Sequence, residues 1–243
     1  MRPTGLEEAF QRAVSQARRP FPAGELRPHA TLPVVRRTRA RAGERSIQRR
    51  AEILRSASAA FARRGFHGAS VEEIARTLGM RKGNLYYYFR NKEEILYFCH
   101  DYSLDILLRL LEEVSDAPGP ADEKLRKLVA GFVHVIVDEL QGSWLTHEMH
   151  ALSPALLRKV IAKRDLFEAG VRKLVREGMD AGVFQAGDPK LASFALLGSL
   201  NWITRWYSPG GERSSKEIAE SFARFVLGGL LARDASERVS GRL

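Results

Sequence analysis

Hydrophobic residues recur every three or four positions from about residue 46 to residue 232, and no segment shows the strict alternation typical of a strand. Glycine and proline mark the breaks between these periodic segments. We therefore predict helices over about 46–64, 71–78, 81–90, 91–116, 121–141, 143–151, 154–181, 189–207 and 214–232. The predicted fold class is all-α, with nine or ten helices.

Two of these predicted helices are short and separated by a glycine turn, in the stretch SVEEIARTLGMRKGNLYYYFRNK at 70–92. Ser70 followed by Glu73 is a capping-box pattern at the start of the first. Leu85 and Phe89, four residues apart, turn one face of the second helix inward. The rest of its surface then carries Lys82, Asn84, Tyr86, Tyr87 and Tyr88. This pattern predicts a helix-turn-helix that lies against DNA, although Tyr86 or Tyr88 could instead belong to the small core.

Charge is unevenly distributed along the chain. Residues 1–45 carry ten basic and four acidic side chains (net +6), 46–92 carry ten and three (net +7), and 93–243 carry nineteen and twenty-two (net −3). Basic side chains that neutralise phosphates release counterions, so the excess indicates that DNA binds the amino-terminal part. A genome rich in Arg codons is the alternative, but it does not explain the change of sign.

Residues 1–45 hold half of the ten prolines and little periodicity, which predicts a mostly disordered basic arm. Such an arm can add phosphate contacts or reach a minor groove. A solvated tail or an overlong start-codon assignment explains it equally well.

The helix-turn-helix ending in LYYYFRNKEE is similar to the amino-terminal domain of the TetR family of one-component transcriptional repressors, with a dense match over about 46–98. This resemblance implies a three-helix DNA-binding domain at 46–92 and a larger helical ligand-binding and dimerisation domain at 93–243. It also implies a homodimer that binds a palindromic double-stranded operator and is released by a small-molecule effector.

In the family, the second helix of the motif enters the major groove. Lys82 and Asn84 are the main candidates for base contacts, because Lys suits guanine and Asn suits adenine. The resemblance points to Ser70, Tyr87 and Lys92 as phosphate-binding residues. Arg81 departs from the Ser or Thr that commonly caps this helix, and Asn84 from the frequent Thr or Ser, so the operator sequence is not predicted. The complete predicted DNA-binding set is Ser70, Arg81, Lys82, Gly83, Asn84, Tyr86, Tyr87, Tyr88 and Lys92.

The segment GSLNWITRWYSPG at 198–210 resembles a motif in the branch of the family that responds to acyl-coenzyme A thioesters. Its amide, two indoles and cation could hold an acyl chain and a phosphate, but two Trp at i and i+4 are as often core or interface. A pair of histidines near Trp144 could line a pocket or bind a metal. The spacing does not favour a metal, and the basic residues after 157 could be a solvated face. The predicted ligand-binding set is Trp144, His147, His150, Arg158, Arg164, Asn201, Trp202, Arg205 and Trp206.

By resemblance, helices 189–207 and 214–232 pair with those of a second copy. The candidate seam residues are Leu196, Leu200, Phe222, Phe225, Val226 and Leu230, with Gly198, Gly228 and Gly229 permitting close approach. Burial within a single subunit is the alternative for each of the six.

Other function classes find little support. The sequence has no GxSxG, Walker or GxGxxG motif, so we do not expect an enzyme or a bound cofactor. One Cys, no run of about 18 apolar residues and no export signal favour a cytoplasmic protein. A regulator of efflux that responds to lipophilic compounds and a ligand-independent DNA-binding protein remain alternatives.

Overall fold

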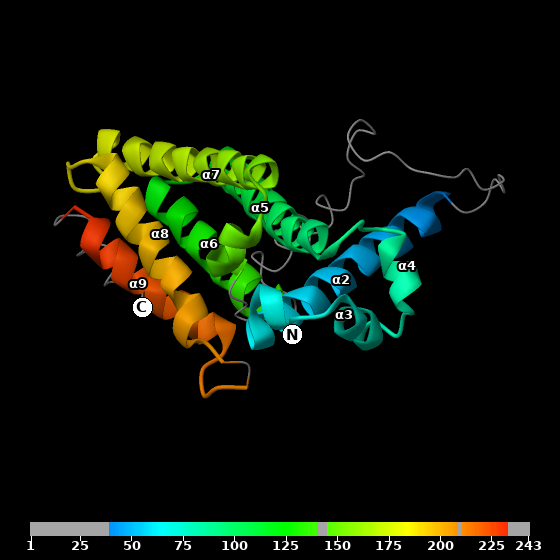
Figure 1. Cartoon of the computed structure of the whole chain (residues 1–243). Helices are drawn as coiled ribbons and strands as arrows, with labels where there is room; N and C mark the ends of the chain where they lie inside the picture. Colours follow the sequence, from blue (N-terminus) through cyan, green and yellow to red (C-terminus); the bar gives the residue numbers. More distant parts are fainter. Residues whose placement is uncertain (1–38, 140–144, 209, 233–243) are drawn as a thin grey trace.

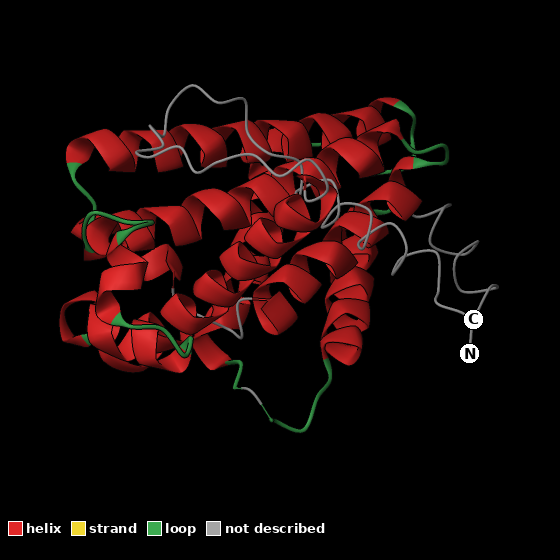
Figure 2. Ribbon diagram, turned by 90° about the vertical axis from the view of Figure 1, so that its right-hand side faces the viewer, coloured by secondary structure: helices red, strands yellow, loops and turns green. Residues whose placement is uncertain are grey.

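The helices form two groups in the computed structural model, which describes residues 39–139, 145–208 and 210–232 (Figure 1). The smaller group lies at the right of Figure 1 and the larger group at the left. The helices are α2 (Arg39–Gly68), α3 (Val71–Thr77), α4 (Lys82–Tyr86), α5 (Lys92–Asp116), α6 (Ala121–His134), α7 (Pro154–Asp180), α8 (Pro189–Trp206) and α9 (Ser215–Leu230), with a π-helical turn η1 (Val135–Glu139) and a 3-10 helix η2 (Leu145–Ala151). Figure 2 shows only helices and loops in the described part, where one isolated antiparallel bridge joins Phe184 and Leu231. The all-α prediction is confirmed.

Helix α2 begins at Arg39, earlier than the start predicted near residue 46. The remainder of the predicted arm, 1–38, lies outside the described residues, so its disorder stays a prediction. Gly65 interrupts α2 with φ 66° and ψ 171°. Only glycine takes up such a positive φ without a steric penalty, which explains why the predicted helix breaks there.

The helix-turn-helix is α3 and α4, covered by α2. The Ser70 hydroxyl accepts a hydrogen bond from the Glu73 N–H (3.1 Å), so this half of the predicted capping box is present. Helix α4 ends at Tyr86 and not near Arg90 as predicted. The N–H groups of Tyr88 and Phe89 both donate to the Leu85 carbonyl (3.0 and 3.1 Å), which closes the helix in a turn. Leu85, fully buried, holds α4 on the small core.

Helix α5 joins the two groups. Asn91 caps it, since its side-chain oxygen accepts from the Glu94 N–H (2.8 Å). Near the start of α5, Cys99 is completely buried and lies beside Ser58 of α2, and burial raises the pKa of the Cys99 thiol to about 12. The amino-terminal turns of α5 therefore belong to the core of the DNA-binding domain.

The larger group packs α5 against α7, α7 against α8, and α6 against both α5 and α9. Close approach depends on small residues: a Cβ on Gly178 of α7 would overlap the Phe184 ring, and one on Gly131 of α6 would overlap Leu110 of α5. The predicted helix 121–141 is α6 followed by η1, and the side chains of Asp188 and Ser214 cap α8 and α9 close to their predicted starts. Within the described ranges, none of the helices has the length and hydropathy to cross a membrane.

Candidate functional site

Helix α4 presents an exposed face at the end of the molecule away from α8 and α9 (Figure 1). Tyr86, Tyr87 and Tyr88 are 42%, 71% and 54% exposed, so none of the three is a core residue, and the rings of Tyr87 and Tyr88 meet edge to face. Arg81, Lys82, Gly83 and Asn84 are exposed on the same short segment. The structure thus brings the predicted base-contacting residues together on one surface.

Lys82 is held by a carboxylate from the preceding helix. Its Nζ forms an ion pair with Oε1 of Glu72 on α3 and lies 5.5 Å from the centre of the Tyr86 ring. The hydrogen bond from Lys82 lowers the pKa of Glu72, and the same bond raises the pKa of Lys82. Lys82 therefore lies at the first turn of α4 as a cation paired with a carboxylate.

Two predicted phosphate-binding residues also have structural roles. Ser70 is exposed, but its oxygen already caps α3. Lys92 donates from Nζ to the carbonyls of His67 (3.2 Å) and Ala69 (2.9 Å), and lies 4.6 Å from the centre of the Phe66 ring. Lys92 thereby ties the start of α5 to the loop between α2 and α3, and its contact with a phosphate stays a prediction.

A cavity of about 400 Å³ lies among α5, α6, α7 and α8. Its walls are largely apolar, and the side chains that line it include Leu104, Leu107, Phe132, Ile136, Met149 and Phe167. Four further lining residues, Ile161, Asp165, Phe194 and Gly198, are exposed to solvent, so the cavity opens between α7 and α8. Apolar walls with few polar groups are typical of a small-molecule site.

His100 of α5 lines this cavity and is 5% exposed. Among the polar residues that line the cavity, Thr204 is the one that is buried more deeply. Its Nε2 atom is buried and has no hydrogen-bond partner among the described residues. Burial, and then the nearby charge of Arg164, lower the pKa of His100 to about 4, so the ring is neutral at pH 7. Arg164 of α7 donates to the Met149 sulfur (3.0 Å), which is a weak acceptor. The pair offers a neutral imidazole and a cation to a ligand.

The structure brings two of the predicted ligand-binding residues to the cavity, Arg164 and Asn201. Trp202, Arg205 and Trp206 are exposed and do not line it: Arg205 lies over Trp202, and Trp206 stacks on Phe222 of α9. His150 and Arg158 are exposed and also outside its lining. Trp144 and the side chain of His147 lie outside the described residues.

His100 and Ser103 line the cavity but were not among the predicted ligand-binding residues. Both lie on the inward face of α5 with Leu96 and Leu107, at helical spacing. A histidine and a serine that continue an apolar stripe are a detectable signal for a polar group inside a cavity. Across the described ranges, no three His, Cys, Asp or Glu side chains are grouped so as to hold a metal ion.

The comparisons with known proteins agree with this architecture. The family "Bacterial regulatory proteins, tetR family" matches residues 53–97, and "Tetracyclin repressor-like, C-terminal domain" matches 118–230. The repressor KstR2 of Mycobacterium tuberculosis is 27% identical over 188 residues, which cover 75% of this chain and 92% of KstR2. The crystal structure of PfmR, a TetR family regulator from Thermus thermophilus, is 32% identical with a TM-score of 0.66 and covers 74% of this chain and 99% of PfmR.

A third structure, AibR in complex with isovaleryl coenzyme A and operator DNA, has a TM-score of 0.63 over 73% of this chain and 97% of AibR. At 24% identity its likeness shows the fold alone. The identity with PfmR over nearly its whole length, and the two matched domains, settle the family. The chain belongs to the TetR family and is a DNA-binding transcriptional regulator of the repressor type, with an amino-terminal helix-turn-helix domain and a carboxy-terminal helical domain.

Proposed function

We propose that this protein binds a palindromic operator as a homodimer and is released by a small-molecule effector, an acyl-CoA thioester whose apolar acyl group enters the cavity of the helical domain. The observation that carries the proposal is the cavity itself, with the unpartnered Nε2 of His100 inside apolar walls. A buried polar group without a partner costs free energy, so a ligand that supplies the partner is favoured.

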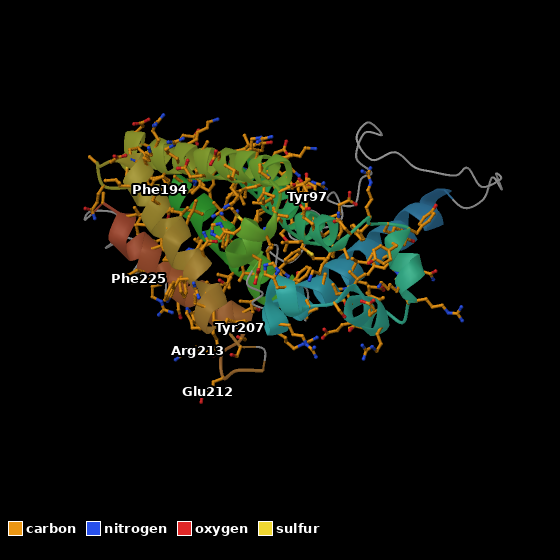
Figure 3. The ribbon with its side chains drawn as sticks, viewed as in Figure 1. Tyr97, Phe194, Tyr207, Glu212, Arg213 and Phe225 are labelled. Carbon is orange, nitrogen blue, oxygen red and sulfur yellow. The ribbon has the colours of Figure 1, made fainter. Side chains whose placement is uncertain are left out.

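The surface of α8 and α9 supports the dimer. Leu191, Trp202 and Phe225 are 65%, 63% and 78% exposed, and Figure 3 shows Phe194 and Phe225 on the side of the molecule away from α4. Exposed aromatic side chains of this number are typical of an interface. A Cβ on Gly228 or Gly229 of α9 would meet no atom within 4 Å, so this surface has room for a partner, whereas Gly198 lines the opening of the cavity. Leu196, Leu200 and Val226 are buried within the subunit and serve its own core instead.

The shape of the cavity supports a ligand with an apolar part inside and a polar part outside. A cavity of about 400 Å³ suits an acyl group, whereas the nucleotide of coenzyme A would have to remain beyond the opening. Arg158 lies one helical turn before Ile161 at that opening and is exposed, so it is placed to meet phosphates. Lys163, in contrast, pairs with Asp105 (2.6 Å) and Asp101 of α5. AibR shows that this fold can hold an acyl-CoA.

The segment that includes η2 connects the cavity to the DNA-binding domain. Met149 lines the cavity and accepts from Arg164, and η2 packs on both α2 and α5. Just before α7, the Ser153 N–H donates to Glu93 of α5 (2.6 Å). A ligand that displaces Arg164 would act on η2, and through it on the orientation of α2 and α4.

The test begins with an operator selected from a random-sequence duplex pool, followed by titration of acyl-CoAs of graded chain length into the protein–operator complex. Dissociation at a preferred chain length is the expected result. Release by lipophilic compounds but not by any acyl-CoA would support the efflux alternative, since the apolar walls alone would suit such ligands. Hydrolysis of the thioester would show an enzyme, and no response to either class would favour a ligand-independent DNA-binding protein.

The same assay tests whether α4, the predicted DNA-reading helix, contacts base edges. Asn84→Ala should weaken operator binding by about 1–3 kcal/mol and relax the preference at one base pair, because a bidentate contact to adenine would be lost. Selection with the variant should recover operators degenerate at that position. Recovery of the unchanged operator at full affinity would contradict the placement of α4 in the groove.

A further inference from the structure

Glu72 is an acidic residue on a surface that otherwise carries positive charge. Residues 46–92 hold ten basic and three acidic side chains. Two of the acids face away from the reading helix: Glu52 pairs with Arg49 (2.7 Å), and Glu73 pairs with Arg63 (3.3 Å) and Arg64 (3.4 Å) of α2. Glu72, whose side chain is 51% exposed, reaches across to Lys82 at the start of α4.

Glu72 opposes a phosphate in two ways. Its own negative charge repels a phosphate that approaches the start of α4. It also pairs with Lys82, the cation that could neutralise that phosphate. A complex held by phosphate contacts alone therefore gains less from this surface than its net charge suggests.

The effect of Glu72 on a contact between Lys82 and a guanine is different from its effect on a phosphate contact. Lys82 has three donor hydrogens, and the carboxylate fixes the ammonium group beside the Tyr86 ring. A lysine held in place can donate to O6 and N7 of a guanine in register, whereas it is poorly placed to follow a phosphate along the backbone. The ion pair thus favours the contact of Lys82 with a base over its contact with the phosphate backbone.

We propose that Glu72 is a specificity-determining residue, which positions Lys82 for one guanine and suppresses binding to DNA of other sequence. This inference rests on the proposed function only in that α4 reads DNA. It assigns to an acidic side chain of α3 a role that the predicted DNA-binding set did not include.

The experiment compares the affinity for random-sequence duplex with that for the selected operator in wild type and Glu72→Gln. At about 0.1 M salt, one additional phosphate contact should raise random-sequence affinity about eightfold and steepen the slope of log K against log salt by about 0.9. Operator affinity should change less than about threefold, so the ratio of the two affinities falls. The side chains of Glu72 and Lys82 are both about half exposed, so their ion pair contributes little to stability. The midpoint of thermal unfolding should therefore be nearly the same in Glu72→Gln and wild type.

Two controls separate this role from a simple charge effect. Glu112→Gln removes an exposed carboxylate about 30 Å along α5 from Lys92 and should alter neither affinity. In a Lys82→Gln background, Glu72→Gln should no longer change the ratio of the affinities. An equal gain on both DNAs, or an unchanged effect without Lys82, would overturn the inference. If the wild type selects no sequence at all, the proposed function fails; if it selects one and Glu72→Gln keeps the ratio, only this inference fails.

Discussion

Buried polar side chains in the helical domain have consequences for stability that can be measured one residue at a time. His100 is held neutral by its surroundings, with a pKa of about 4 against about 6.5 for an exposed imidazole. Its unfolded form binds a proton over a pH range in which its folded form does not. The free energy of unfolding is therefore highest above pH 6.5 and falls as the pH is lowered toward 4.

We predict that replacing His100 by Gln flattens this part of the pH dependence. The contribution of the single imidazole between pH 7 and pH 4 is at most about 3 kcal/mol, because each unit of difference between the folded and unfolded pKa is worth about 1.4 kcal/mol. Urea unfolding at pH 7, 5.5 and 4.5 measures it. His150→Gln is the matched control, because His150 is exposed and should leave the pH dependence as it is. An equal slope in all three proteins would show that carboxylates alone cause the loss.

Gly178 offers a second prediction at this scale. A Cβ at this position of α7 would overlap the Phe184 ring and approach Ala121 of α6. Gly178→Ala should therefore destabilise the fold by about 1–3 kcal/mol, since buried backbone and ring must move apart. Gly187→Ala, where the new methyl would lie 3.8 Å from its nearest neighbour, should leave the midpoint of thermal unfolding nearly unchanged. A similar loss in both variants would contradict this packing argument.

At the scale of the element, helix boundaries were predicted well wherever a side chain caps the helix. Asn91, Asp188 and Ser214 each accept a backbone hydrogen bond at the predicted starts of α5, α8 and α9. The end of α4 was predicted several residues too late, because the Leu85–Phe89 spacing fits a helix as well as the turn that the chain adopts. A local spacing pattern does not distinguish a continued helix from a turn when the next helix, α5, begins only a few residues later.

Helix α8 shows why the ligand site was harder to predict than the helix that bears it. Gly198 and Asn201, three residues apart, lie on the cavity side, while Trp202 and Trp206, four residues apart, lie on the exposed side. Both faces are rich in apolar residues, so periodicity alone does not say which one turns to the cavity. Only the packing of α7 and α6 around α8 decides it.

The contact between α5 and the start of α7 leads to a prediction about coupling. Glu93→Gln weakens the hydrogen bond to the Ser153 N–H, which links the DNA-binding domain to the ligand domain. We expect ligand affinity of the free protein to change less than about twofold, while the factor by which ligand weakens operator binding becomes smaller by about threefold or more. Calorimetry and mobility-shift titration measure the two quantities. Glu177→Gln, an exposed carboxylate of α7, serves as control. An unchanged factor would place the coupling elsewhere.

At the scale of the whole molecule, charge and exposed apolar surface are separated. The basic excess lies in the part that contains α4 with its three exposed tyrosines, whereas the exposed Phe and Trp side chains lie on α8 and α9. The division of charge follows from the sequence itself. The sequence did not separate the residues of α8 and α9 that pack inside the subunit from those on its surface, because both kinds are apolar.

We predict that Phe225→Asp converts the dimer to a monomer and abolishes operator binding. Phe225 is 78% exposed on α9, and a carboxylate buried without a partner at an interface costs several kcal/mol. Sedimentation or light scattering at micromolar concentration gives the mass. Leu166→Asp is the matched control, since Leu166 of α7 is 61% exposed and outside the proposed interface. Dissociation by both variants, or by neither, would contradict the assignment of α8 and α9.

The single cysteine is a built-in probe of the core of the DNA-binding domain. Cys99 is sealed between α2 and α5, and its thiol stays protonated with a pKa of about 12, so a maleimide can modify it only while those helices are apart. The rate of alkylation under native conditions therefore reports how often α2 and α5 separate. Bound operator should slow that rate and a releasing effector should alter it, without any substitution in the chain.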